Sequence, residues 1–302
     1  MRIDYVVVAY SSAGDLPACL DSITADAPPD AGIIVVDNAS PDDSAAVANS
    51  HPAAPKVVRS ETNLGFGGGC NLGASNSEAD AVFFVNPDAR LAAGVSAALV
   101  AEFEANARAG AAAPRVVDPT GESRAASAGA EPGLRSTVGH YLLLGRVPLL
   151  RTLFRPLHLA RPERRASPDW VSGAAMLVRR EAFVAVGGFD ERIFMYMEDV
   201  DLCRRLRASG WTVEYLPDVR VEHRIGGSQS SDQPARWFNS YFDYVRGRNG
   251  SGDARLAALA AGLGLGLRAF AYRVSRPANS ARVGRAARAA FHVAFGRSTR
   301  SG

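Results

Sequence analysis

Tyr5-Val-Val-Val-Ala-Tyr10 is the first of four short apolar runs in the N-terminal third of the chain. The other three cover residues 33–36, 57–59 and 81–85, and helix-compatible segments at 16–23, 42–49 and 70–76 separate the four runs. Apolar runs that alternate with helices predict parallel strands joined by helical crossovers. We therefore expect an α/β fold in which helices cover both faces of a mostly parallel central sheet.

Polar or flexible residues follow each of these runs. Ligands bind parallel sheets at the carboxyl ends of strands, so these residues are the first candidates for a binding site. They are Tyr10-Ser-Ser, Asp37-Asn38, Asn63-Leu-Gly-Phe-Gly67 and Asn86-Pro-Asp88. Asp37 is placed to accept hydrogen bonds from a nucleobase or ribose, with a turn aspartate as the alternative. The glycines at 65–69 let the backbone approach a ligand closely, which by itself is weak evidence.

Asp88 and His223 are candidates to meet a divalent cation. A hard cation that carries a diphosphate keeps several waters, so one or two protein ligands suffice. His223 follows strand-like segments at 212–216 and 219–221, and a glycine-rich loop that ends in Ser228 comes after it. Such a loop can close over phosphate oxygens, but a lone histidine is more often structural, so its role stays open from the residues alone.

Three carboxylates stand together in the second half of the chain. The stretch Trp170-Val-Ser-Gly173 leads to Gly-Gly-Phe-Asp190-Glu and then to Met-Glu198-Asp199-Val-Asp201-Leu-Cys-Arg-Arg205. At helical spacing Asp199 shares a face with apolar residues three, four and seven positions later, so it should point toward packed protein. Burying a carboxylate is unfavourable without a partner or a chemical role, although a helix N-terminus favours its charge. Asp199 is therefore a candidate base, with helix capping as the alternative. Asp201 is expected to form an exposed pair with Arg205.

Composition is that of a globular protein. Of the 302 residues, 47% are hydrophobic and 22% are charged, which is enough to bury one large core or two smaller ones. The three cysteines show no paired ligand spacing, and their odd number argues against a disulfide framework. The N-terminal apolar run is short and carries Asp4, so it indicates a buried strand rather than a signal peptide. We expect a cytoplasmic protein.

The C-terminal segment is basic. From Arg255 onward there are nine arginines and no acidic residue, whereas the remaining 25 basic and 31 acidic residues give the rest of the chain a net charge of −6. The apolar run at 256–267 is only 12 residues long, well short of the ~20 that a membrane span needs. On a helix, one face would carry Arg282, Arg285, Arg288 and His292, a pattern suited to an anionic membrane surface. Nucleic-acid binding is not expected, because no aromatic residues interleave with the arginines.

Taken together, the order and spacing of the quoted blocks over residues 2–230 resemble the inverting family 2 glycosyltransferases of GT-A fold, and most of all their rhamnosyltransferase-like branch. The resemblance implies a GT-A domain at 1–230, with a nucleotide-binding half at 1–96 and an acceptor half at 97–230. A basic helical extension at 231–302 would follow, and the enzyme would work at the inner face of the membrane.

The resemblance also implies a role for each matching residue. Asp199 would be the general base, with Glu198 as the alternative. Asp88 and His223 would hold a divalent metal, Mg or Mn, while Trp170 and Gly173 would border the acceptor. The nucleotide-sugar would contact Tyr10, Asp37, Asn63, Gly65, Gly67, Asn71, Asn86 and Asp88, with the loop at 63–71 closing the pocket.

The implied reaction moves a sugar, in the best interpretation L-rhamnose from dTDP-rhamnose, to a saccharide or lipid-linked saccharide. Asn86 departs from the usual two-acid metal motif, which weakens the expected cation affinity. One alternative is a non-catalytic nucleotide-sugar-binding scaffold at the membrane. An NAD-dependent oxidoreductase would explain the glycines, but Cys70 stands at the sixth position, where the dinucleotide fingerprint has glycine. Residues 141–160 fit either a mobile flap or a lipid-facing surface.

Overall fold

A computed structural model describes residues 1–120, 127–147, 149–150, 152–155, 157–159, 162–224, 233–275 and 277–295. The chain divides into two compact units. The first consists of residues 1–129 and 161–228, and the second of residues 130–160 and 229–302. Residues 130–160, which the sequence analysis placed in an acceptor half, thus group with the C-terminal helices.

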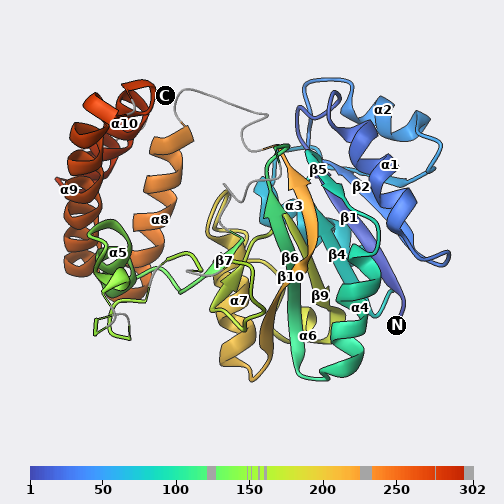
Figure 1. The fold of residues 1–302 in the computed structure, drawn as a ribbon. Helices are drawn as coiled ribbons and strands as arrows, with labels where there is room; N and C mark the ends of the chain where they lie inside the picture. Colours follow the sequence, from blue (N-terminus) through green and yellow to red (C-terminus); the bar gives the residue numbers. More distant parts are fainter. Residues whose placement is uncertain are drawn as a thin grey trace. The chain divides into compact units, whose positions relative to one another are not determined.

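The first unit is built on an eight-stranded sheet with the strand order β3-β2-β1-β4-β9-β6-β10-β5 (Figure 1). Its first four strands are all parallel to one another. They are β1 (Ile3–Ala9), β2 (Gly32–Asp37), β3 (Lys56–Arg59) and β4 (Ala81–Val85), joined by α1 (Leu16–Asp26), α2 (Ser44–Ser50) and α3 (Gly65–Ser75). The predicted alternation of strands and helices is confirmed.

The side chains of β1 point alternately into two apolar layers, one on each face of the sheet. Tyr5 and Val7 lie in a core shared with Leu20 of α1 and with Phe103 of α4 (Val95–Ala105). The opposite face carries α3, α6 (Arg180–Ala185) and α7 (Glu198–Ala208), where the rings of Phe84, Phe183 and Phe189 contact one another. Period-2 alternation in a strand with two covered faces gives this arrangement.

The later strands complete the sheet in a mixed manner. The antiparallel strand β9 (Ala175–Arg179) lies between β4 and β6 (Ala109–Val117). The segments expected at 212–216 and 219–221 form one strand, β10 (Thr212–His223), with an irregularity in its pairing to β6 between Leu216 and Arg220. The short strand β5 (Ala89–Leu91) forms the edge, and β7 (Ala128–Gly129) pairs with β8 (Trp170–Val171) in a separate small sheet.

The strand directions bring the candidate residues to one edge. Because β9 is antiparallel to both β4 and β6, those two strands run in the same direction, and β10 is parallel to β6. The carboxyl ends of β1, β2, β4 and β10 therefore meet at the same edge of the sheet. The candidate residues Tyr10, Asp37, Asp88 and His223 stand at or directly after these strand ends.

The second unit is helical. It contains α5 (Leu134–Tyr141), α8 (Gln233–Asn249), α9 (Ser251–Ser275) and α10 (Pro277–Ala294). Phe238, Tyr241 and Phe242 of α8 are buried and form part of the core of this unit. Tyr241 shares a 2.5 Å hydrogen bond with Thr137 of α5, through their hydroxyl groups.

Helix α9 is longer than the apolar run that was identified in the sequence. The apolar run at 256–267 belongs to a longer helix, in which residues 251–273 are long and apolar enough to cross a membrane by length and composition. Within the apolar window 44% of the residues are buried, against neighbouring helices. A packed helix passes the same test, so composition alone does not decide between a packed helix and a membrane span.

Candidate functional site

Three residues from two strand ends meet at the centre of the candidate site. His223, the last residue of β10, places its Nε2 atom 3.0 Å from the Oδ1 atom of Asp88, which follows β4. The side-chain amide nitrogen of Asn86 lies 3.2 Å from the same imidazole nitrogen. All three predicted residues are therefore brought together, over a separation of more than 130 positions in the chain.

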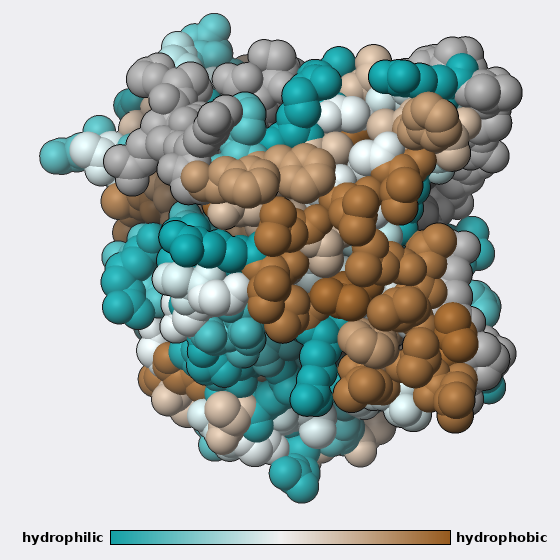
Figure 2. All heavy atoms as spheres, turned by 90° about the vertical axis from the view of Figure 1, so that its left-hand side faces the viewer, coloured by the Kyte–Doolittle hydropathy of each residue, from teal (hydrophilic) through white to brown (hydrophobic). Residues whose placement is uncertain are grey.

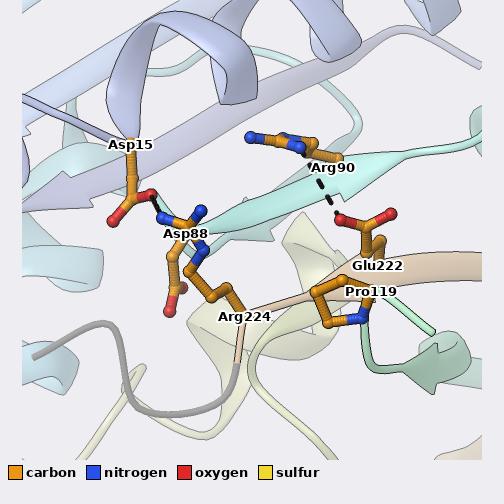
Figure 3. A pocket seen from close by; sticks show the side chains of 6 residues that line it. All are labelled: Asp15, Asp88, Arg90, Pro119, Glu222 and Arg224. Carbon is orange, nitrogen blue, oxygen red and sulfur yellow. Dashed lines mark hydrogen bonds and ion pairs between the residues drawn. The ribbon is translucent and has the colours of Figure 1, made fainter. Parts of the chain in front are cut away.

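A pocket opens beside this cluster and is lined by acidic and basic side chains (Figure 3). Arg224 donates a 2.9 Å hydrogen bond from Nη1 to Asp15, while Arg90 pairs with Glu222 at 3.7 Å. Arg224, which directly follows His223 on the chain, was not among the residues expected from the sequence. A guanidinium at the carboxyl end of a strand, next to a candidate metal ligand, is suited to phosphate oxygens.

The cluster fits a divalent cation that takes most of its ligands from elsewhere. One carboxylate and one imidazole present an oxygen and a nitrogen donor side by side, and Mg²⁺ or Mn²⁺ accepts both. Among the described residues, no group of three or more histidine, cysteine, aspartate and glutamate side chains could hold a metal. Diphosphate and water would therefore supply the remaining ligands.

Asp37 and Asn38 hold the turn at the end of β2. Asp37, 1% exposed, accepts hydrogen bonds from the Ser40 amide at 3.1 Å and from Arg59 Nε at 3.2 Å. The buried Asn38 side chain bonds to Asn63, to the Leu64 amide and to the Gly65 carbonyl. No role was expected for Asn38 from the sequence. Its side chain joins the end of β2 to the residues that follow β3.

The glycine segment is a helix rather than an open loop. Helix α3 begins at Gly65, whose φ of +74° suits glycine, and a Cβ at this position would overlap the Phe194 carbonyl. A Cβ at Gly67 would lie 3.0 Å from the Phe189 Cβ, so Gly67 allows α3 to pack closely on that side chain. The expectation of a loop over residues 63–71 is therefore wrong from Gly65 onward, while the contacts of Gly65 and Gly67 with the nucleotide-sugar stay predictions.

Asn71 faces the protein instead of an open pocket. Its amide bonds both backbone groups of Phe189, at 2.9 and 3.0 Å, and the Glu191 carboxylate at 3.0 Å. This contact fixes the Gly-Gly-Phe-Asp turn that precedes α7. The described geometry thus gives Asn71 a positioning role.

The acid pair lies at the start of α7. Tyr196 and Met197 precede it with φ values of 65° and 73°, which are unfavourable for residues with side chains. Asp199, half-buried, accepts hydrogen bonds from the Gly173 amide at 2.9 Å and from the Val200 amide at 2.8 Å. The strained turn and the Gly173 contact together fix the direction of this carboxylate.

Glu198 differs from its neighbour. It is 7% exposed, and its Oε2 atom has no hydrogen-bond partner. Burial and the nearby Asp199 raise the pKa of Glu198 to about 8, and burial also raises the pKa of Asp199. Because two backbone amides stabilise the Asp199 carboxylate, the pair is expected to keep its proton on Glu198 and its negative charge on Asp199.

Asp201 corrects one expectation. It forms the predicted pair with Arg205, at 2.6 Å, and a second with Arg204, at 2.8 Å. Asp201 is only 6% exposed, however, so the pairs are buried rather than on the surface. Arg205 also donates to the Val186 carbonyl, which ties α7 to the end of α6.

A short path joins the acid pair to the histidine cluster. The backbone amide of Gly173 contacts Asp199, and the carbonyl of the neighbouring Ala174 accepts a 2.9 Å hydrogen bond from the backbone amide of Asn86. Asn86 in turn contacts His223. The candidate base and the candidate metal ligands therefore lie at the same edge of the sheet.

Three predicted contacts have less direct support. Tyr10 is 48% exposed at the end of β1 and is free to meet a ligand, whereas Trp170 is 8% exposed and pairs in register with Gly129. A Trp170 contact with the acceptor stays a prediction. The glycine-rich loop that ends in Ser228 lies outside the described residues.

Comparisons of sequence identify the class. The sequence profile described as "Glycosyl transferase family 2" matches residues 4–184, and "Glycosyltransferase like family 2" matches residues 145–243. An N-acetylglucosaminyl-diphospho-decaprenol L-rhamnosyltransferase of Mycobacterium tuberculosis is 36% identical over 242 residues, which cover 75% of this chain and 77% of that protein. The Escherichia coli rhamnosyltransferase WbbL is 49% identical over 80 residues, 26% of this chain and 30% of that protein.

Comparisons of structure support the fold. A mannosyltransferase of Pyrobaculum calidifontis, in complex with GDP-Man and Mn²⁺, superposes with a TM-score of 0.62 and 16% identity, covering 98% of this chain and 86% of that one. GalNAc-T7, with UDP, GalNAc and Mn²⁺, gives a TM-score of 0.59 and 16% identity over 82% of this chain and 50% of that one. At such identities the likeness concerns the fold alone.

Proposed function

Because this chain belongs to glycosyltransferase family 2, we propose that it transfers L-rhamnose from dTDP-rhamnose to a lipid-linked saccharide during synthesis of a cell-envelope polysaccharide. The donor sugar is supported by the names of two relatives, which are rhamnosyltransferases. A diphosphate-polyprenol-linked sugar as acceptor is supported by the name of the mycobacterial relative, with which this chain shares 36% identity.

The observation that carries the proposal is the position of Asp199 and the Asp88–His223 pair at one sheet edge, joined through Gly173, Ala174 and Asn86. An inverting transfer needs a base on one side of the sugar carbon and stabilisation of the leaving diphosphate on the other. No second carboxylate has to act as a nucleophile, in contrast to retaining glycosidases.

In the proposed mechanism Asp199 accepts the proton of the acceptor hydroxyl as that oxygen attacks the anomeric carbon, and the bond to the diphosphate breaks. The two backbone amides that bind the carboxylate hold it in position. Asp88 and His223 would hold a Mg²⁺ or Mn²⁺ ion, which supplies positive charge for the leaving diphosphate. Arg224 would exchange its bond to Asp15 for phosphate oxygens.

The donor side of the proposal assigns Tyr10, Asp37 and Asn63 to the nucleoside, with Asn38 and Gly65 shaping the turn that carries Asn63. The acceptor would enter beside Gly173, next to the base. Binding both substrates in one cleft supplies part of the rate acceleration, because the reacting atoms are held at attack distance.

Thermal stabilisation tests the donor. Saturating dTDP with Mn²⁺ should stabilise the protein more than UDP, GDP or NAD, since ligand at 100 times its dissociation constant adds roughly 2.7 kcal/mol. His223→Gln should weaken the Mn²⁺-dependent part of that stabilisation. Stabilisation by NAD alone would contradict the proposed class of ligand.

Product formation tests the transfer itself. The full chain, incubated with dTDP-rhamnose and an N-acetylglucosaminyl-diphospho-lipid, should yield a product one rhamnose heavier, detected by mass spectrometry. Tight dTDP-rhamnose binding without product or donor hydrolysis, over a panel of lipid-linked acceptors, would favour the non-catalytic scaffold.

A further inference from the structure

Helix α9 directs its small residues inward and most of its large apolar residues outward, with Leu265 as a buried exception. A Cβ added to Gly262 would approach the Phe291 ring of α10 to 2.9 Å, and one added to Gly264 would overlap the Tyr141 carbonyl at the end of α5. The inward face consists of Ala254, Ala257, Ala258, Ala261, Gly262, Gly264 and Leu265. The outward face consists of Leu256, Leu259, Leu263, Leu267 and Phe270, which are 37–71% exposed.

This arrangement is the reverse of an ordinary surface helix, which buries its large apolar side chains and exposes polar ones. The five outward residues recur at intervals of three and four positions, so they form one continuous stripe. Figure 2 shows apolar side chains gathered over a broad part of this face of the molecule. Contiguous exposed apolar surface of this kind marks an interaction site.

A second exposed apolar segment belongs to the same unit. Leu143, Val147, Leu149 and Leu153 follow α5, and Leu149 is 89% exposed. Arg268 of α9 donates hydrogen bonds to the carbonyls of His140 and Tyr141, so the start of this segment is attached to α9. We call the α9 stripe and these four residues the apolar surface.

Positive charges flank the apolar surface. Arg255 and Arg273 are exposed near the two ends of the α9 stripe, and no acidic residue follows Asp253 in the sequence. Helix α10 exposes Arg285, Arg288 and His292 along one side, as its sequence pattern predicted, whereas the side chain of Arg282 lies outside the described residues. Cations beside exposed leucines are typical of helices that bind anionic lipid surfaces.

We propose that the apolar surface lies in the interface of an anionic lipid bilayer, with the α9 stripe among the upper acyl chains and the flanking arginines at the lipid phosphates. This inference goes beyond sugar transfer and does not depend on which donor or acceptor the enzyme uses. It assigns membrane attachment to the leucines of α9, in addition to the basic residues of the tail.

Two other occupants fit the surface less well. In a symmetric pair of chains the same patch meets itself, so the flanking arginines would face arginines, and Asp253 is the one acidic residue of α9 that could compensate. If α9 crossed the membrane, α10, which packs against it, would carry Arg285 and Arg288 into the hydrocarbon. A position in the plane of the interface avoids both difficulties.

Vesicle flotation of the full chain tests the proposal. The protein should bind vesicles of phosphatidylcholine that contain about one-third phosphatidylglycerol, and bind pure phosphatidylcholine weakly. Leu263→Gln with Leu267→Gln should reduce binding about tenfold or more, because two apolar side chains no longer enter the acyl region. Val184→Gln is the matched control, since Val184 is 66% exposed on α6 in the other unit, and should leave binding unchanged.

Each result has a defined meaning. Arg285→Gln with Arg288→Gln should reduce binding to the anionic vesicles on the order of tenfold and abolish their advantage over neutral ones. Unchanged binding in the double leucine variant would overturn the proposal, and so would a dimer in light scattering that the same variant converts to monomer. Circular dichroism and dTDP binding establish that each variant is folded.

A fluorescent label locates the helix relative to the bilayer. All three native cysteines are buried, so a cysteine introduced on the surface can be labelled selectively. An environment-sensitive dye on Leu263→Cys should shift to shorter wavelength with anionic vesicles, whereas the dye on Val184→Cys should not. Equal shifts, or none at either position, would contradict insertion through α9.

Discussion

At the scale of single residues, the two adjacent carboxylates of α7 have different surroundings. Two backbone amides bind Asp199, whereas one oxygen of Glu198 has no partner. A carboxylate held by amides keeps its charge more easily than one in an apolar site, and a base must be ionised to accept a proton. This difference supports Asp199 over Glu198 as the base.

Asp199→Asn should lower kcat by about 10²- to 10⁴-fold, because general base catalysis contributes roughly that factor. Binding of dTDP-rhamnose, measured by calorimetry, should remain unchanged, since the proposed role concerns the acceptor hydroxyl. The control is Asp243→Asn, which removes an exposed carboxylate of α8. Normal turnover by Asp199→Asn, with turnover lost in Glu198→Gln, would transfer the role of base to Glu198.

The raised pKa of Glu198 predicts a dependence of stability on pH. Since the pKa is about 8 in the folded protein against 4.5 as the ordinary value, the folded state binds the extra proton. The contribution of this proton to the stability of the folded protein is complete below pH 4.5 and is lost as pH rises to about 8. Glu198→Gln should therefore gain stability relative to wild type between pH 5 and pH 9, on the order of 2 kcal/mol or roughly 4–8 °C in Tm.

Thermal unfolding across that range measures the effect. Glu61→Gln, at an exposed position, serves as the control and should follow the wild-type curve at every pH. A constant difference between Glu198→Gln and wild type from pH 5 to pH 9 would mean that Glu198 does not hold the proton.

At the scale of elements, the sequence predicted the four parallel strands within residues 1–85 and the positions of α1 and α2, because alternation of period 2 and period 3.6 is local, whereas β5 and α4 were not expected. It did not predict α3 correctly. Four glycines within five positions are typical of a loop, yet these residues form a helix because the missing side chains allow close contact with β1. The reason lies in Val6 and Val8 of β1, which pack directly against Gly73 and Gly69 of α3, and local propensity does not contain it.

Gly69→Ala tests this explanation. A Cβ at Gly69 would lie 2.6 Å from Cγ1 of Val8, so the substitution should reduce the free energy of unfolding by about 1–3 kcal/mol despite the better helix propensity of alanine. Gly266→Ala in α9 is the matched control. A Cβ there meets no atom within 4 Å, so that variant should be neutral or up to ~1 kcal/mol more stable in urea unfolding.

At the scale of the whole molecule, part of the site could be predicted and part could not. The carboxyl-end rule selected Asp37, Asp88 and His223 because it requires only the strand order along the chain. The buried pairs of Asp201, the packing role of Asn71 and the inverted face of α9 depend on which elements meet in space. Sequence periodicity shows that a helix or strand has an apolar face, but it does not show which other element covers that face.

The two compact units each have an apolar core, and this predicts how the chain unfolds. Residues around Tyr5, Phe83 and Leu99 form the core of the first unit, while Phe242 and Ala261 are buried in the second. Separate cores favour separate cooperative transitions. Scanning calorimetry of the full chain should show two transitions rather than one.

Two substitutions assign those transitions. Gly69→Ala should lower only the transition of the first unit. Gly262→Val, whose side chain would press on the Phe291 ring between α9 and α10, should lower only that of the second. Both should fall by several degrees, since a loss of about 1 kcal/mol shifts Tm by roughly 2–8 °C for domains of this size. If either substitution shifts a single shared transition, the two cores unfold as one cooperative structure.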